Sequence, residues 1–318
     1  MTFFNRFVII NNILDPPLEE GLSIGGKGMR INELYNQKRQ VISLEIFPPK
    51  KEDSLNSLYE AMHELTSLSP DFISVTYSAG GSGNSEKTVQ IASDIKNKYN
   101  TESLAHLTCI SADETSIDNY VKMLMDNNIQ NILALRGDIP KGVDISRNRF
   151  KYAKDLIFYI KDKYPSLCIG AAAYPEGHAD CDNFEDSLEH LKEKVDGGAD
   201  FLITQLFFDN LYFYNFYEKA LKKGINIPIS AGIMPILSRS QIEKMIFMCG
   251  ASLPSKIVRL LNKYENDSHS LKMAGIEYAA NQIIDLCKNG VDGVHIYTMN
   301  QPIIARECIN RLKEAKNG

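Results

Sequence analysis

One acidic residue stands inside an apolar stretch of the sequence. Glu45 is flanked by Leu44, Ile46 and Phe47, so folding is expected to remove its carboxyl group from water. Burial disfavours the charged form of a carboxyl group and raises its pKa. A carboxylic acid that keeps its proton near neutral pH can serve as a general acid. The alternative is a structural role, in which Glu45 forms a buried ion pair with Arg136 or with a lysine, and the residues leave both interpretations open.

The tripeptide Arg136-Gly137-Asp138 follows the apolar run 131–135 and is a second candidate. Gly137 permits a tight turn, so that Arg136 and Asp138 can both face the same side of the chain. The alternative is a turn held by a local ion pair between Arg136 and Asp138, and the residues alone favour it. Chemistry at this turn is therefore a hypothesis that needs support from the rest of the sequence.

Polar or conformationally special residues also end or follow the other apolar runs. In a βα barrel, the carboxyl ends of the strands meet at one face, and active sites lie there. The residues are Thr76 and Tyr77; His106 and Thr108; Tyr174, Glu176 and His178; Thr204 and Gln205; Gly232 and Met234; and His295, Tyr297 and Asn300. We therefore expect these side chains to converge on one mouth.

Three weaker patterns resemble phosphate-binding or metal-binding motifs. The glycine-rich segment 78–83 could present backbone N–H groups to phosphates, but a mobile loop is the preferred interpretation. Segment 21–28 approaches a phosphate-binding loop but has Gly28 where that motif requires Ser or Thr. His178 and Cys181 have the spacing of metal ligands without a second pair, so we expect no metal site.

From Gln40 onward the sequence repeats one unit, which consists of a short apolar run, a loop and a segment of helical periodicity. These units must position the residues named above. The runs are 41–46, 72–76, 104–109, 131–135, 168–173, 201–205, 227–231 and 293–297, and the helical segments are 54–67, 87–99, 113–127, 151–163, 184–197, 210–223, two or three within 239–288, and 302–315. Nearly continuous apolar runs are typical of parallel strands buried on both faces. Eight such units predict an α/β fold, a closed (βα)8 TIM barrel with extra helices between strands 7 and 8. An open doubly wound sheet is the alternative.

Composition and charge exclude several classes of protein. The 318 residues are 44% hydrophobic and 24% charged, which suffices for a large core. The formal charge of -5 argues against a nucleic-acid partner, and no apolar stretch approaches the roughly 18 residues of a membrane span. Six scattered cysteines indicate reduced thiols and a cytoplasmic protein. We expect residues 1–28 to be a poorly ordered N-terminal extension and residues 29–318 to be a single catalytic domain.

Nine motifs, in order, resemble the methylenetetrahydrofolate reductase family and extend over about residues 41–315. They are Glu45-x-Phe47-Pro48-Pro49, Ser74-Val75-Thr76-Tyr77, Ala105-His106-Leu107-Thr108-Cys109, Asn131–Asp138, Ala173–His178, Lys194–Asp200, Thr204-Gln205-x-Phe207-Phe208-Asp209, Gly232-Ile233-Met234-Pro235 and His295-x-Tyr297-Thr298-x-Asn300. Such an ordered set is far more specific than any one of its members.

The resemblance implies a βα-barrel flavoenzyme with bound FAD, and NADH or NADPH as the hydride donor. By that match Glu45 is the general acid, and Asp138 stabilises a cationic folate intermediate near the flavin. Gln205 and Gln241 hold the folate, and Thr76 also meets the nicotinamide donor. The implied FAD contacts are Thr76, His106, Arg136, Gly137, Asp138, Tyr152, Ala153, Tyr174, His178, His190 and Lys194.

The activity that the resemblance implies is reduction of 5,10-methylenetetrahydrofolate to 5-methyltetrahydrofolate by ping-pong hydride transfer, in a homo-oligomer. One alternative is a flavin- and folate-binding subunit that receives electrons from a partner protein, and another is a non-catalytic binding protein. Two departures bear on folate binding. Gln301 stands where family members commonly carry Arg, and Met245 stands where some have an aromatic residue.

Overall fold

The computed structural model describes residues 29–38, 40–49, 54–77, 82–139 and 148–317. The predicted N-terminal extension (1–28) and most of the predicted glycine-rich loop (78–81) lie outside the described residues.

Eight parallel strands close into a barrel in sequential order, which confirms the predicted fold. The strands are β1 (Val41–Ile46), β2 (Phe72–Val75), β3 (Glu102–Thr108), β4 (Asn131–Leu135), β5 (Cys168–Ala173), β6 (Phe201–Thr204), β7 (Ile229–Ile233) and β8 (Gly293–Tyr297). Closure pairs β1 with β8, with Ser43 opposite His295 and Glu45 opposite Tyr297. Because every strand has two neighbours, the alternative of an open sheet is wrong.

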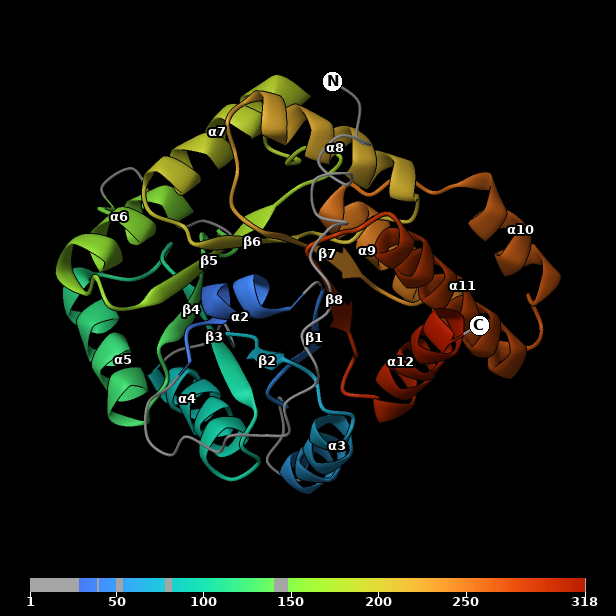
Figure 1. Cartoon of the computed structure of the whole chain (residues 1–318), viewed down its shortest axis with the longest axis horizontal. Helices are drawn as coiled ribbons and strands as arrows, with labels where there is room; N and C mark the ends of the chain where they lie inside the picture. The colour runs from blue at the N-terminus through green and yellow to red at the C-terminus, as the bar shows by residue number, and fades with distance from the viewer. Residues whose placement is uncertain (1–28, 39, 50–53, 78–81, 140–147, 318) are drawn as a thin grey trace.

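Helices surround the barrel as an outer ring (Figure 1). They are α3 (Leu55–Ser67), α4 (Ser82–Asn97), α5 (Glu114–Asp126), α6 (Ala153–Lys163), α7 (Phe184–Asp196), α8 (Asn210–Lys222), α9 (Arg239–Cys249), α10 (Ser255–Lys263), α11 (Ser268–Lys288) and α12 (Pro302–Asn317). Three of them, α9, α10 and α11, separate β7 from β8, as the sequence predicted for this segment. Among the described helices, none has the length and apolar character needed to cross a lipid bilayer.

The largest hydrophobic core lies between the strands and the outer helices, and a smaller cluster fills the amino-terminal end of the barrel. The short helix α2 (Ile31–Gln37) lies across that end (Figure 1) and inserts Ile31 and Leu34 beside Phe72 and Phe201. This end is therefore closed by apolar packing, and the opposite end is left for chemistry.

Strand β7 begins two residues later than the sequence predicted. Pro228 lacks an amide hydrogen and cannot donate to a sheet ladder, although its carbonyl accepts from the amide of Leu202. Regular pairing therefore starts only at Ile229, and the strand extends to Ile233.

Candidate active site

A cavity of about 1330 Å³ opens at the carboxyl ends of the strands. Among the residues that line it are side chains from β1, β3, β4, β5, β6 and β8 or from loops that follow strands. Nine of the residues to which the resemblance gives a role line it: Glu45, Thr76, His106, Arg136, Gly137, Asp138, Tyr174, His178 and Gln205. The fold therefore brings together residues that are dispersed over most of the chain.

The carboxylate of Glu45 lies between two imidazole rings from other strands. Its Oε2 atom is 3.4 Å from Nε2 of His295 on β8 and 3.6 Å from Nε2 of His106 on β3. His295 is fully buried and His106 is nearly so. The predicted alternative of an ion pair with Arg136 or a lysine is wrong, because the partners are these two histidines.

These neighbours also reverse the pKa shift that the sequence predicted for Glu45. Burial alone raises the pKa of this carboxyl group. The hydrogen bond with His295 and the positive charge that His106 and His295 can carry lower that pKa below its ordinary value. The prediction of a raised pKa is therefore wrong, because an apolar flanking sequence does not reveal which polar groups other strands bring to the carboxylate.

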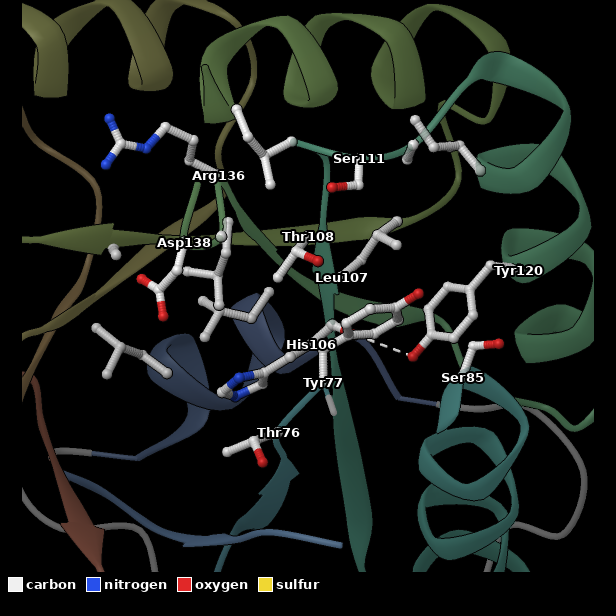
Figure 2. A pocket seen from close by; sticks show the side chains of 18 of the residues that line it. Thr76, Tyr77, Ser85, His106, Leu107, Thr108, Ser111, Tyr120, Arg136 and Asp138 are labelled. Atoms are coloured by element: carbon white, nitrogen blue, oxygen red, sulfur yellow. Dashed lines mark hydrogen bonds between the residues drawn. The ribbon is translucent and has the colours of Figure 1, made fainter. Parts of the chain in front are cut away.

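His106 is held as a neutral ring at the wall of the cavity. Burial lowers its pKa to about 4, although the charge of Glu45 opposes that shift. Its Nε2 atom is buried without a hydrogen-bond partner among the described residues. Behind it, the Tyr120 hydroxyl donates to the carbonyl oxygen of His106 over 2.9 Å and so fixes the strand at this residue (Figure 2).

Ser43 determines the orientation of His295 from the opposite side of the ring. The Ser43 hydroxyl lies 2.8 Å from Nδ1 of His295 and donates its hydrogen to the carbonyl oxygen of Val294 over 3.3 Å. A hydroxyl has one hydrogen, so while it donates to Val294 it accepts from Nδ1–H. The Nε2 atom of His295 is thereby directed to Glu45, and Ser43, His295 and Glu45 form a continuous chain.

The turn after β4 separates the two charged side chains that flank Gly137. Arg136 forms an ion pair of 2.8 Å with Asp180, so the predicted local pair between Arg136 and Asp138 is wrong. Figure 2 shows the Asp138 carboxylate directed into the same space as the His106 ring, and Arg136 directed away from it. Gly137 has a φ of +83°, and a Cβ there would lie 2.9 Å from Cβ of Thr108. The turn therefore requires glycine.

The far wall of the cavity is formed by residues of β6 and β8, and β7 lies between these strands. The Tyr297 hydroxyl donates to the carbonyl oxygen of Thr204, and the Thr204 hydroxyl accepts from the amide of Gly232, both over 2.9 Å. A Cβ at Gly232 would lie only 2.2 Å from the carbonyl oxygen of Thr204. Gln205 follows Thr204 and lines the cavity, and its amide oxygen accepts from the amide of Leu206.

A second group of predicted residues continues from the cavity along β5 and α7. The rings of Tyr174 and His178 meet edge to face, with centroids 4.6 Å apart, and Nζ of Lys194 lies 5.5 Å from the centre of the Tyr174 ring. Nζ of Lys194 donates to the carbonyl oxygen of Ala172. Burial lowers the pKa of Lys194 to about 8. This group supplies a cation and aromatic surface next to the cavity.

Besides Lys194, four of the residues that the resemblance implies do not line the cavity. Tyr152 and Ala153 stand at the start of α6, and His190 is exposed on α7, with Nδ1 3.5 Å from Sγ of Cys181. The Gln241 side chain accepts from the amide of Leu237 and donates to the carbonyl oxygen of Pro235. In this structure Gln241 holds the β7–α9 loop, and its role toward folate stays a prediction.

The sequence analysis expected His295 and Tyr297 at the mouth without giving them a role beside Glu45, and it did not single out Ser43. A signal was present, because His295 and Tyr297 alternate along an otherwise apolar strand as Ser43 and Glu45 do. Alternating residues of a strand share one face. The pairing of β1 with β8, which places all four on the inner face, is not readable from either strand alone.

Comparison with known proteins identifies the family of this chain. The family model for methylenetetrahydrofolate reductase matches residues 30–313. The chain belongs to the methylenetetrahydrofolate reductase family.

Relatives in this family come from plants, fungi and bacteria. "Methylenetetrahydrofolate reductase (NADH) 1" of Arabidopsis thaliana is 35% identical over 284 residues, which cover 85% of this chain and 48% of that protein. "5,10-Methylenetetrahydrofolate reductase" of Escherichia coli K12 is 34% identical over 260 residues, which cover 82% of this chain and 86% of that protein. The chain thus spans about half the length of the plant relative, and of a fission-yeast relative as well.

A solved structure shares the fold at low sequence identity. A protein from Clostridium thermocellum, described as binding two copies of 5-methyl-5,6,7,8-tetrahydrofolic acid, aligns with a TM-score of 0.59 and 15% identity over 91% of this chain and 99% of that chain. At this level of identity, the likeness supports the barrel fold alone.

Proposed function

We propose that this chain reduces 5,10-methylenetetrahydrofolate to 5-methyltetrahydrofolate, with FAD as its bound cofactor and NADH or NADPH as the donor. Membership of the family supports the reaction. The observation that carries the proposal is the position of Glu45 between His106 and His295 in the wall of a large cavity. A proton donor then lies beside a space that is large enough for planar ligands.

The residues present fit a flavin dinucleotide. The cavity exceeds the roughly 300–1,000 Å³ that is usual for a single small-molecule ligand, so it has room for a flavin ring and a second planar ligand. The unpartnered Nε2 of His106 and the cations of Arg136 and Lys194 are suitable contacts for the polar ring edge and the phosphates. Bound FAD, once reduced by NADH or NADPH, would supply the hydride that the one-carbon unit of the folate receives.

Opening of the methylene bridge in the substrate requires a proton on the leaving nitrogen. We assign that proton to the pair formed by Glu45 and His295. Burial raises the pKa of Glu45, but the hydrogen bond with Nε2 of His295 over 3.4 Å and the neighbouring imidazole rings lower it in this structure. When ligands displace water from the mouth, desolvation favours the neutral acid, and Glu45 can donate the proton to the substrate.

Asp138 supports the same step through its charge. The opened bridge is a cationic iminium group, and an ionised carboxylate close to it lowers its energy where water is excluded. Asp138 lines the same cavity as Glu45. The two carboxylates therefore have separate roles, one in proton transfer and one in charge stabilisation.

Anaerobic mixing tests the proposal directly. Purified protein is mixed first with NADH and then with methylenetetrahydrofolate while flavin absorbance is followed. We expect the flavin absorbance to bleach with NADH and to recover when the folate is added, with 5-methyltetrahydrofolate as product. A protein that takes up no flavin, or a reduced protein that the folate does not reoxidise, would contradict the proposal.

The same experiment separates direct reduction from electron delivery by a partner protein. Bleaching by NADH or NADPH alone supports the direct reaction. Flavin that stays oxidised with both nucleotides, but is bleached by dithionite and then reoxidised by the folate, would support the partner-dependent alternative.

A further inference from the structure

The backbone makes a strained turn directly after β8. Met299 and Asn300 have φ angles of +53° and +55°, so two consecutive residues with side chains adopt the left-handed conformation. Such residues rarely do so, because the Cβ atom then crowds the backbone. Met299 packs against the outer core and against a second buried cluster that contains Phe208 and Ile236, so tertiary contacts keep the turn in place. Strain of this kind persists only where the surrounding structure demands it, and it is common at functional sites.

The turn places two side chains against the end of β1. The Thr298 hydroxyl donates to the carbonyl oxygen of Glu45 over 2.6 Å, and the amide of Thr298 approaches the same oxygen at 3.3 Å. The Asn300 side chain accepts from the amide of Phe47 over 3.0 Å and donates to its carbonyl oxygen over 2.8 Å. The amide of Asn300 also donates to the Thr298 hydroxyl over 3.2 Å, which joins the two contacts. We call Thr298 and Asn300 the rim pair.

The rim pair takes over where regular pairing between β1 and β8 stops. The register of these strands ends with Glu45 opposite Tyr297, and β1 itself ends at Ile46. Beyond this point the side chains of the rim pair fasten the backbone at Glu45 and at Phe47. Thr298 is fully buried, so water does not compete for its hydroxyl group. The backbone is therefore held at the proton donor itself and again two residues later.

The contacts of Glu45 leave little room for movement. Its Oε2 atom lies 3.4 Å from Nε2 of His295 and 3.6 Å from Nε2 of His106. Both distances are at the long limit of a hydrogen bond, so a small displacement of the Glu45 backbone would break the contacts. A misplacement of about 1 Å in an active site can lower a reaction rate on the order of 100-fold. The position of this backbone therefore bears directly on proton transfer.

We propose that Thr298 and Asn300 are positioning residues, which hold Glu45 at the distance from His295 that proton transfer to the substrate requires. The left-handed turn is retained because it presents these two side chains to β1. The inference rests on the proposed function, because it takes Glu45 to be the proton donor of the folate reaction. The rim pair then matters for the folate half-reaction and not for reduction of the flavin by NADH.

The variant Asn300→Gly separates positioning from backbone strain. Glycine adopts a positive φ readily, so this variant relieves strain while it removes both hydrogen bonds to Phe47. We expect the rate of flavin reoxidation by saturating methylenetetrahydrofolate to fall about 10- to 100-fold. Flavin reduction by NADH should stay within about twofold of the wild type. Stopped-flow absorbance measures both rates.

The variant Asn128→Gly is the matched control. Asn128 is exposed in the turn after α5 and has a φ of +61°, so it combines the same residue type and backbone conformation with a position outside the cavity lining. Both half-reactions should be unchanged in this variant. A general effect of glycine at a left-handed position would appear in both variants, whereas loss of the rim pair appears only in N300G.

Two variants of Thr298 test the other half of the rim pair. Thr298→Val keeps the shape of the side chain but removes the hydroxyl group, so it should slow the folate half-reaction as N300G does. Thr298→Ser keeps the hydroxyl group and should restore a rate within about threefold of the wild type. This rescue distinguishes the hydrogen bond to Glu45 from the packing of the methyl group.

A second measurement does not depend on reductase activity. Nitrogen NMR of isotope-labelled histidines reports whether Nε2 of His295 keeps its hydrogen bond, and the His295 signal is identified as the one lost in His295→Gln. In N300G and T298V this signal should move toward its position in Glu45→Ala, which lacks the carboxylate. In N128G it should not move.

Unchanged folate rates in N300G and T298V would overturn the inference, whether or not the His295 signal moves. An equal fall in both half-reactions, or loss of the flavin, would assign the rim pair a purely structural role and overturn it as well. Failure of the proposed function is distinct from these outcomes. A wild-type protein that does not reduce the folate would contradict the reductase activity, and the NMR comparison would still show whether the rim pair holds Glu45 at His295.

Discussion

At the scale of single residues, the chemistry depends on how the proton near Glu45 is shared. The Nε2 atoms of His295 and His106 both lie within 3.6 Å of Oε2 of Glu45, so each ring can exchange a proton with the carboxylate. Ser43 orients the His295 ring, and burial keeps His106 neutral near neutral pH. The donor is therefore best regarded as a small group of residues and not as an isolated acid.

Replacing Glu45 by Gln should separate the two half-reactions. The variant keeps the size of the side chain and removes its proton, so we expect flavin reduction by NADH to remain within about twofold and folate reduction to fall by at least about 100-fold. Stopped-flow absorbance measures both. Exposed Glu60 on α3 supplies the control E60Q. Equal loss in both half-reactions would contradict the assignment.

Burial of His106 should make the protein less stable in acid. Its pKa is about 4 in the folded protein against an ordinary value of 6.5. Between these pH values the unfolded chain binds a proton and the folded chain does not, so the free energy of unfolding falls as pH decreases from 6.5 to 4. The loss is on the order of 3 kcal/mol.

Urea denaturation over this pH range checks the effect. The H106Q variant should show a smaller fall in stability, whereas H63Q, which changes an exposed histidine on α3, should follow the wild type. If the free energy of unfolding of H106Q falls with pH as steeply as that of the wild type, other groups cause the acid sensitivity.

At the scale of elements, the β1–β8 pair and helix α11 position the site. The register places Ser43 opposite His295 and Glu45 opposite Tyr297, and these residues alternate with apolar residues of the outer core. Helix α11 packs against β7 and β8 and touches the β7–α9 loop at Gly275. Helix α11 can approach the barrel this closely because Gly275 has no side chain.

The variant Gly275→Ala should push α11 away from that loop. The added methyl group would meet the carbonyl oxygen of Ile236 at 1.8 Å, which backbone movement must relieve. We expect a loss of about 1–3 kcal/mol in the free energy of unfolding, although alanine favours helices more than glycine does. Urea denaturation measures it. Asn281→Ala, at an exposed position of the same helix, should change stability by only a few tenths of a kcal/mol.

At the scale of the whole molecule, we expect one end of the barrel to serve catalysis and the other to serve stability. The carboxyl end holds the cavity and the polar residues. The amino end is closed by α2, whose Ile31 amide donates to Oδ1 of buried Asn131 over 2.8 Å. Nδ2 of Asn131 in turn donates to Glu102 over 3.1 Å. Changes at this end should affect stability and not catalysis.

The variant Asn131→Ala tests that division. It leaves the buried Ile31 amide and Glu102 without this partner, so we expect a loss of about 2–4 kcal/mol in the free energy of unfolding. Below the unfolding temperature, kcat and KM should stay within about twofold of the wild type. Asn226→Ala, in an exposed loop before β7, is the control and should change neither stability nor kinetics appreciably. A large change in KM for N131A would contradict the division.

The sequence by itself determined the eight strands, their order and which polar residues stand at their ends, because burial on both faces demands continuous apolar runs and a carboxyl group within such a run is conspicuous. Only the tertiary structure decided the neighbours of Glu45. His295 lies 250 positions away and reaches Glu45 through closure of the barrel. A pKa depends on charges and hydrogen bonds within a few ångströms. Local periodicity contains no information about which distant strand supplies them, so the direction of the shift could not be predicted from the residues flanking Glu45.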